Sequence, residues 1–149
     1  MSEIDKIKNL REATGLSLNQ IKKALDEAGG DEKKAAEIIK SYGAEMAGKK
    51  SSRKVGEGIV DSYIHSTKKA GSLIEILCET DFVARNSEFQ ALAHDIAMHI
   101  TAMQPADTAE LLTQPFVKDP SITVQDLINS AIGKLGENIQ IGEFTVFKI

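Results

Sequence analysis

The sequence has little cysteine, proline and tryptophan, and it lacks a long hydrophobic run. Its 149 residues include one cysteine, three prolines and no tryptophan. The single cysteine, Cys78, excludes an intrachain disulfide framework and any zinc site built from several cysteines. No apolar stretch approaches the roughly 18 residues that a membrane-spanning helix needs, and the N-terminus lacks the features of a signal peptide. We therefore expect a cytoplasmic protein with no membrane partner.

Charge is abundant in the chain but is divided unevenly. Hydrophobic residues make up 42% and charged residues 27% of the sequence, which is typical of a globular protein with a packed core. Residues 1–58 carry 12 Lys and Arg against 10 Asp and Glu, whereas residues 59–149 carry 6 against 12. This difference indicates two modules with different surfaces. The acidic second part argues against direct nucleic-acid binding.

The first 42 residues have the periodicity of helices. Ser17 and Gln20 form a capping box at the start of a second helix, Gly29-Gly30 ends that helix, and Asp31 caps a third. The pattern predicts a three-helix module over residues 1–42. Apolar residues recur at the three- and four-residue spacing of one helical face: Ile4, Ile7, Leu10, Leu18, Ile21, Leu25, Ala35, Ile38, Ile39 and Tyr42.

Residues 43–58 interrupt this periodicity. Four glycines alternate there with the basic cluster Lys49–Lys54, and this composition predicts a flexible basic linker. The basic cluster could also contact phosphate groups. No aromatic residue is interleaved for base stacking, so a solvated tether is the preferred interpretation.

The part after the linker begins with two segments rich in β-branched and aromatic residues. Residues 59–65 and 72–79 predict a β-hairpin with its turn at residues 68–71. Ser87 and Gln90 form a second capping box, and the apolar spacing that follows predicts a helix to Met103.

The last third of the chain is predicted to contain one more helix and one more strand. Residues 105–122 hold all three prolines and read as a loop, and Thr123 caps a helix that Gly136 ends. Residues 139–149 predict a strand with a bulge at Gly142. The fold class is therefore α+β, with an antiparallel-sheet core and packed helices over residues 59–149.

Residues that carry chemistry are sparse and are not arranged as a catalytic site. The histidines, at positions 65, 94 and 99, lack metal-ligand spacing, and no phosphate-binding glycine loop is present. His94 and His99 are expected on the surface of their helix, and Cys78 is expected to be a buried small hydrophobic residue. We expect neither covalent catalysis nor a metal or cofactor.

The stretch Thr80-Asp81-Phe82-Val83 lies between a predicted strand and a predicted helix. From the residues alone two interpretations stay open. In the first, Phe82 packs on the core and Asp81 caps a turn. In the second, the four residues form a loop that is presented to a partner.

Two long motifs and one short one carry a resemblance to a known family. EILCETDFVARN at residues 75–86 and LREATGLSLNQIKKAL at residues 10–25 resemble signatures of the elongation factor Ts family, and GENI at residues 136–139 is also similar. The family's members are nucleotide exchange factors of the GTPase elongation factor Tu. The resemblance implies a ubiquitin-associated-like module, a linker and an antiparallel-sheet core. Many members carry two related core halves and this chain has room for one, which implies a homodimer.

The resemblance also implies the residues that contact the GTPase, and it implies that the partner is elongation factor Tu. Phe82 would be an apolar wedge near the magnesium and phosphate site, Asp81 would disturb the groups that hold magnesium, and Thr80 and Val83 would shape the loop. A second contact region would lie in the N-terminal module: Arg11, Thr14, Gly15 and Leu18.

Three other hypotheses stay open at this point. The first 42 residues could serve only as a ubiquitin-associated-like tethering adaptor. The basic cluster at residues 49–54 could bind RNA, which would make binding sensitive to salt. A hydrolase or transferase has the least support from the residues.

Overall fold

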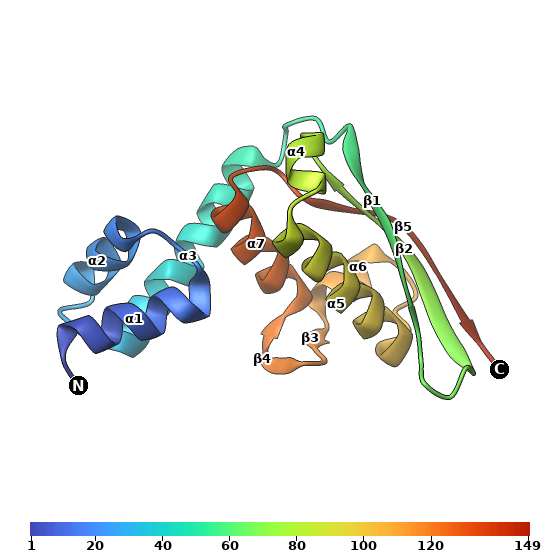
Figure 1. Ribbon diagram of the computed structural model, residues 1–149, viewed down its shortest axis with the longest axis horizontal. Helices are drawn as coiled ribbons and strands as arrows, with labels where there is room; N and C mark the ends of the chain where they lie inside the picture. Colours follow the sequence, from blue (N-terminus) through green and yellow to red (C-terminus); the bar gives the residue numbers. More distant parts are fainter.

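The chain begins with three helices and continues into an antiparallel sheet that helices cover on one face (Figure 1). The computed structural model describes all of residues 1–149. The predicted α+β class is confirmed. The elements in chain order are α1 (Glu3–Thr14), α2 (Leu18–Glu27), α3 (Glu32–Lys50), β1 (Glu57–Ile64), β2 (Ala70–Cys78), α4 (Asp81–Ala84), α5 (Ser87–Met103), α6 (Thr108–Thr113), β3 (Pro115–Phe116), β4 (Asp119–Thr123), α7 (Val124–Leu135) and β5 (Gln140–Lys148).

Local capping fixes the ends of the first helices. The Ser17 hydroxyl accepts a hydrogen bond from the Gln20 amide at 3.3 Å, and the Gln20 side chain accepts one from the Ser17 amide at 3.1 Å. This is the predicted capping box, and Asp31 caps α3 as predicted. The prediction that Ile4 belongs to the apolar face of the first helix is wrong for packing, because the Ile4 side chain is 77% exposed and lies outside the core. The seven buried residues of this small core are Leu10, Ile21, Ala24, Leu25, Ala28, Ala35 and Ile39.

Helix α3 is longer than the sequence pattern predicted. It continues through Lys50, so the flexible linker predicted over residues 43–58 is wrong for residues 43–50. The second half of α3 packs on α7, where a Cβ atom at Gly43 would lie only 3.2 Å from the Asn129 carbonyl oxygen. Met46 and Ala47 pack against the core beneath the sheet. The apolar pattern lapses here because the second half of α3 faces α7 and the core beneath the sheet, and not the N-terminal helices.

The sheet has the strand order β1-β2-β5, and both pairs are antiparallel. The predicted hairpin is confirmed, but its turn lies between Ile64 and Ala70, earlier than predicted. Lys68 adopts a left-handed conformation there with φ of 63°. The predicted irregularity at Gly142 is also confirmed, because the β2–β5 register shifts between Ile74 and Ile76.

Helix α5 and the one-turn α4 pack on the inner face of the sheet, and α7 packs against α5, around a core of 17 buried residues. Asn86, and not Ser87, is the N-cap of α5, because the Asn86 side chain accepts the Glu88 amide at 2.7 Å. The prediction of a loop over residues 105–122 is wrong, since α6 and the β3–β4 hairpin form there. Helix α7 has its predicted limits, with Thr123 as N-cap and Gly136 as C-cap.

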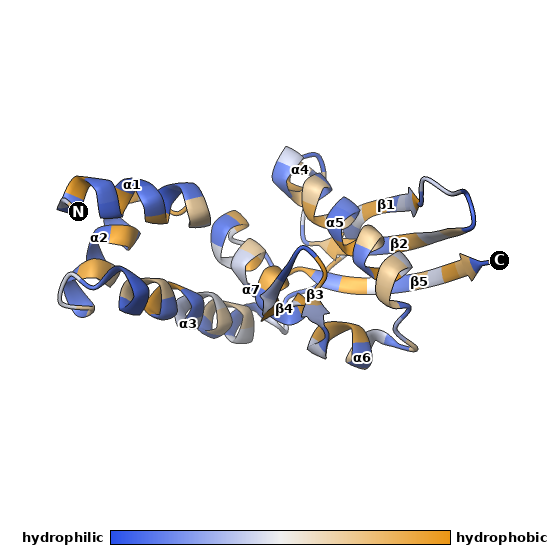
Figure 2. Ribbon diagram, turned by 90° about the horizontal axis from the view of Figure 1, so that it is seen from below, coloured by the Kyte–Doolittle hydropathy of each residue, from blue (hydrophilic) through white to orange (hydrophobic).

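The outer face of the sheet is not covered by any helix, and its strands carry hydrophobic residues (Figure 2). Four large hydrophobic side chains of these strands are between 49% and 74% exposed: Val60, Ile64, Leu73 and Phe147. A cavity of about 260 Å³ opens beside them near the β1–β2 turn. None of the helices combines the length and apolar character needed to cross a membrane.

Candidate functional site

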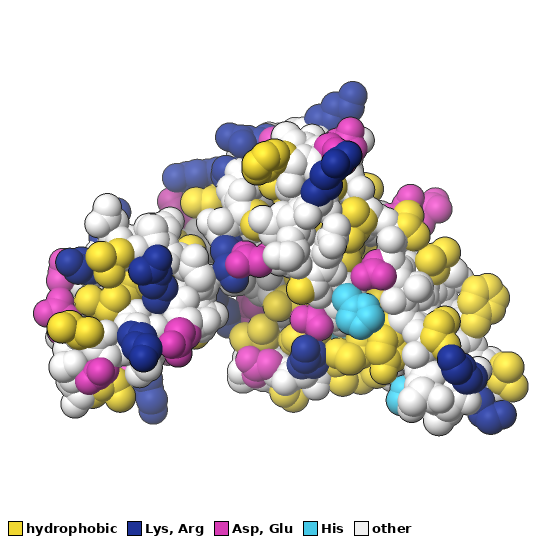
Figure 3. Space-filling view, in the orientation of Figure 1, with side chains coloured by type: hydrophobic (Ala, Val, Ile, Leu, Met, Phe, Trp, Pro, Cys, Tyr) yellow, Lys and Arg dark blue, Asp and Glu magenta, His cyan; other side chains and the backbone are white.

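The segment with residues 80–83 forms a single helical turn at one edge of the sheet region, directly after β2. The Thr80 hydroxyl caps α4 by accepting a hydrogen bond from the Val83 amide at 3.3 Å. Val83 and Ala84 are 6% and 2% exposed and belong to the core, whereas Phe82 is 88% exposed. The interpretation in which Phe82 packs on the core is therefore wrong. The space-filling view shows hydrophobic atoms beside basic and acidic side chains over α4 (Figure 3).

The helical turn itself explains why Phe82 points outward. Consecutive residues on a helix are rotated by about 100°, so when Val83 and Ala84 face the core, Phe82 faces water. Asp81 forms an ion pair with Arg85 at 2.8 Å one turn later, and both side chains are more than half exposed. Asp81 thus lies beside Phe82 on the exposed side of the turn.

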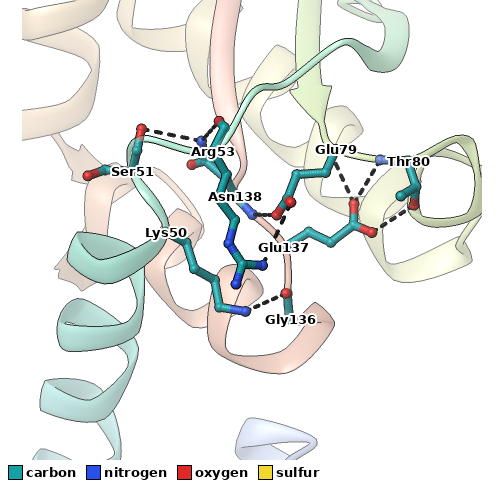
Figure 4. Close-up of polar contacts among 8 residues, drawn as sticks. All are labelled: Lys50, Ser51, Arg53, Glu79, Thr80, Gly136, Glu137 and Asn138. Atoms are coloured by element: carbon teal, nitrogen blue, oxygen red, sulfur yellow. Dashed lines mark hydrogen bonds and ion pairs between the residues drawn. The ribbon is translucent and has the colours of Figure 1, made fainter.

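A network of polar contacts joins this turn to the segment after α7 (Figure 4). The Glu137 carboxylate accepts hydrogen bonds from the amides of Glu79 and Thr80 at 3.1 and 3.0 Å, and from the Thr80 hydroxyl at 2.7 Å. In the opposite direction, the Glu79 carboxylate accepts a hydrogen bond from the backbone amide of Asn138 at 2.6 Å. Each of the two segments therefore provides a carboxylate that accepts hydrogen bonds from the backbone of the other.

The segment after α3 enters the same network. The Asn138 side chain, which is buried, donates to the Arg53 carbonyl at 2.8 Å. Arg53 lies 3.7 Å from the Glu79 carboxylate, and Lys50 donates to the Gly136 carbonyl at 2.6 Å. Lys49 forms an ion pair with Glu45 at 3.3 Å, so three members of the basic cluster at residues 49–54 contact groups within the chain.

The residues expected to form the second contact region lie around the end of α1 and the start of α2. Arg11 is exposed, and Leu18 is 42% exposed and so is not a core residue. Thr14 donates its hydroxyl proton to the Leu10 carbonyl at 2.6 Å, and Gly15 ends α1 in the left-handed conformation. The structure does not bring these residues against the 80–83 turn, because α1 and α2 lie at the opposite side of α7 from α4 (Figure 1).

Two residues with reactive side chains, Cys78 and His99, are buried. Burial raises the pKa of the Cys78 thiol to about 11, and the thiol donates to the Thr80 carbonyl at 3.2 Å. Cys78 is fully buried, as predicted. No group of three or more His, Cys, Asp or Glu side chains is arranged to hold a metal ion.

His99 corrects another expectation, since it is fully buried and not at the surface. Its Nδ1 accepts the Val117 amide at 3.1 Å, so Nε2 carries the proton and donates to Gln114 at 2.9 Å. Burial lowers the pKa of this imidazole below its usual value. Each of its partners lies 15 or more residues away in the sequence, which is why helical periodicity alone did not reveal the contact.

Comparison with known proteins gives one consistent family. A family model described as "Elongation factor TS" matches residues 79–149. The elongation factor Ts of Carboxydothermus hydrogenoformans is 38% identical over 188 residues, covering 96% of this chain and 87% of that protein. The elongation factor Ts of Thermosipho melanesiensis is 37% identical, covering 96% of both chains. That of Rubrobacter xylanophilus is 35% identical, covering 99% of both.

These alignments also show a difference in length. The match to the Carboxydothermus protein runs over 188 residues, whereas this chain has 149. The relative therefore carries internal segments that this chain lacks.

Proposed function

Because this chain belongs to the elongation factor Ts family, we propose that it is a guanine nucleotide exchange factor for elongation factor Tu. It binds the GDP-bound GTPase and promotes release of GDP, so that GTP can bind. No covalent step belongs to this function, and the protein acts in the cytoplasm where translation takes place.

The observation that carries the proposal is the exposure of Phe82. A phenylalanine that is 88% exposed gains nothing from the hydrophobic effect in the free protein. Aromatic side chains that enter a partner's pocket are typical anchors of protein interfaces. The burial of its neighbours Val83 and Ala84 fixes the backbone from which the ring projects. Phe82 is therefore the wedge that enters the GTPase.

The acidic neighbour of the wedge supplies the second part of the mechanism. Asp81 is exposed beside Phe82, and its carboxylate would enter the surroundings of the magnesium ion together with the ring. The metal is the largest charge that compensates the phosphates of GDP, so displacing its ligands weakens nucleotide binding. Thr80 and Val83 maintain the shape of the turn through the cap between them.

Thermodynamic linkage sets the direction of the effect. A factor with equal affinity for the empty and the nucleotide-bound GTPase would shift no equilibrium. The factor must therefore bind the empty form more tightly, and by reciprocity GDP or GTP must weaken the binding of the factor. Binding of GTP then releases the factor for another cycle.

The N-terminal helices provide a second contact with the GTPase in this proposal. Arg11 and the half-exposed Leu18 offer a charge and an apolar group at the corner between α1 and α2. Thr14 and Gly15 shape the corner by ending α1. This contact adds affinity and orientation, while the turn at residues 80–83 acts on the nucleotide.

A homodimer is the remaining part of the proposal, with the second copy completing the surface that binds the GTPase. The uncovered outer face of the sheet, with Val60, Ile64, Leu73 and Phe147, supplies hydrophobic area for such an interface. Sedimentation equilibrium of the wild type and of Phe147→Asp would test it. A wild-type protein that stays monomeric at micromolar concentration would refute the proposed homodimer.

The exchange function is tested by stopped-flow release of fluorescent GDP from elongation factor Tu. The wild type is expected to accelerate release, and Phe82→Ala to reduce the acceleration at least about tenfold, which is the effect of losing an interface anchor. Met103→Ala is the matched control, because Met103 is 45% exposed at the far end of α5. Release that is no faster with the wild type than without it would refute the proposal.

A further inference from the structure

The turn that carries Phe82 cannot hold its own conformation. Helix α4 has four residues, and a helix of this length is unstable in water because nucleation is unfavourable. Phe82 contributes no packing, since the ring is 88% exposed. The contacts that hold the turn must therefore come from elsewhere in the chain. The core contacts of Val83 and Ala84 fix its end, so its beginning at Thr80 needs a separate support.

Glu137 is that support. One oxygen of its carboxylate accepts the amides of Glu79 and Thr80, and the other accepts the Thr80 hydroxyl. Hydrogen bonds to an ionised carboxylate are stronger than those between neutral groups. A single half-buried side chain thus satisfies three donors at the point where β2 ends and α4 begins.

The contact with Glu137 also sets the cap of α4. The Thr80 hydroxyl has one proton, and it donates this proton to Glu137 at 2.7 Å. A lone pair of the same oxygen is then free to accept the Val83 amide at 3.3 Å. The carboxylate of Glu137 therefore orients the group that caps the turn, although Glu137 lies 57 residues away from Thr80 in the sequence.

The position of Glu137 is itself fixed by its neighbour. Asn138 is 2% exposed, its amide donates to the Glu79 carboxylate, and its side chain donates to the Arg53 carbonyl. The backbone at residues 137–138 is thus bound from two sides (Figure 4). This arrangement lets Glu137 act as a rigid support.

We propose that Glu137 is a positioning residue that orders the turn at residues 80–83 before the GTPase arrives. The inference rests on the proposed exchange function for its consequence, but not for its geometry. Ordering a flexible segment on binding weakens affinity, whereas a segment that is already ordered avoids this cost. Glu137 touches the turn and not the nucleotide site, so its loss weakens capture of the GTPase more than it slows the release step.

Two kinetic constants separate this role from that of Phe82. GDP release is measured against increasing factor concentration, which gives a maximal rate and a half-saturating concentration. For Glu137→Ala we expect a half-saturating concentration about tenfold higher and a maximal rate within about threefold of the wild type, where tenfold corresponds to about 1.4 kcal/mol. For Phe82→Ala we expect the maximal rate to fall.

Two further variants control for charge and for shape. Glu137→Gln keeps an oxygen that can accept both backbone amides, and it is expected to restore the half-saturating concentration to within about threefold of the wild type. Glu57→Ala removes a carboxylate from a residue opposite Cys78 in the sheet, and that carboxylate has no hydrogen bond or ion pair. It is expected to behave as the wild type, and an equal effect of both alanine variants would overturn the proposal in favour of a general charge effect.

Amide hydrogen exchange in the free protein tests the geometry without the GTPase. In Glu137→Ala, exchange at the amides of Thr80 and Val83 is expected to accelerate at least about tenfold, while amides in the middle of α5 keep their protection. Unchanged protection at Thr80 and Val83 would overturn the proposal. If Glu137→Ala loses protection throughout the chain, the milder single variants Glu137→Gln and Thr80→Val are compared instead. Equal protection of the residue 83 amide in these two variants would overturn the proposal. A wild type that fails to accelerate GDP release refutes only the exchange function.

Discussion

The core beneath the sheet has 17 buried hydrophobic residues, whereas the core of the N-terminal helices has seven. Fully burying a large aliphatic side chain contributes roughly 1.5–3 kcal/mol, and ordering one residue costs a comparable amount. The larger core gathers α5, α7 and the sheet around side chains such as Phe89 and Ile96, both fully buried. The smaller one includes three alanines among its seven members. The N-terminal helices therefore depend on further contacts to stay folded.

Helix α3 supplies those contacts. Its first half buries Ala35 and Ile39 in the small core, and its second half packs Met46 and Ala47 against the large one. An ion pair between Lys40 and Asp126 at 3.2 Å joins α3 to α7 between these two halves. The two regions are therefore connected by a continuous helix, which links the corner between α1 and α2 to the region that carries Phe82.

The largest expected effect on stability comes from removing one buried side chain from each core. Phe89→Ala is expected to cost about 3–5 kcal/mol and to reduce amide protection in both regions, because the small core depends on the large one. Ile21→Ala is expected to cost about 2–5 kcal/mol in the N-terminal helices while α5 stays protected. Hydrogen exchange combined with urea denaturation distinguishes the regions.

Ile4→Ala serves as the control for these two variants, because Ile4 is 77% exposed and its loss should change stability by less than about 0.5 kcal/mol. Equal loss of protection in α1 and α5 for Ile21→Ala would mean that the two cores unfold as one unit.

A smaller effect is expected from separating α3 and α7. In Gly43→Leu the new side chain meets the Asn129 carbonyl, since even its Cβ would lie 3.2 Å from that oxygen. We expect a cost of about 1–3 kcal/mol, with faster amide exchange in α1 and α2 than in the wild type. Gly48→Leu is the matched control in the same helix, because no atom lies within 4 Å of a Cβ at that position. A loss of stability in Gly48→Leu as large as that in Gly43→Leu would contradict the close-packing explanation.

The smallest expected effect is the pH dependence of stability, which should differ between the two regions. The N-terminal helices contain no histidine, whereas the sheet region buries His99 with a lowered pKa. Because the unfolded chain binds a proton more readily than the folded one, the stability that neutral His99 provides is complete above about pH 6.5 and is lost as the pH falls toward the lower folded pKa. The slope in this window is at most about 1.4 kcal/mol per pH unit.

Urea denaturation at several pH values from 5 to 8 measures this slope for the wild type and for His99→Gln. The exposed His94 and the remaining histidine are present in both proteins, so the difference between the two slopes reports His99 alone. Identical slopes would show that His99 is not linked to folding.

The sequence predicted the features that depend on neighbouring residues. The capping box at Ser17, the N-cap at Thr123 and the glycine that ends α7 lie within one turn of the groups they satisfy. Their hydrogen bonds form between residues three or four positions apart, so the residue types alone indicate them. The hairpin and the irregularity at Gly142 follow from strand alternation in the same way.

The tertiary structure decided the features whose partners are distant. The second half of α3 is a helix that packs on α7, His99 is buried by the segment around Phe116, and Phe82 is exposed because its two successors face the core. The motif that contains Phe82 marks the candidate site in the sequence, but the residues alone left two orientations of the ring open. Glu137 supports that site from 57 positions away. Local signals in the sequence determined elements such as α2 and α7, whose caps lie within one turn of the groups they satisfy. Only the packed chain decided how far α3 extends, which side chains meet and which remain in water.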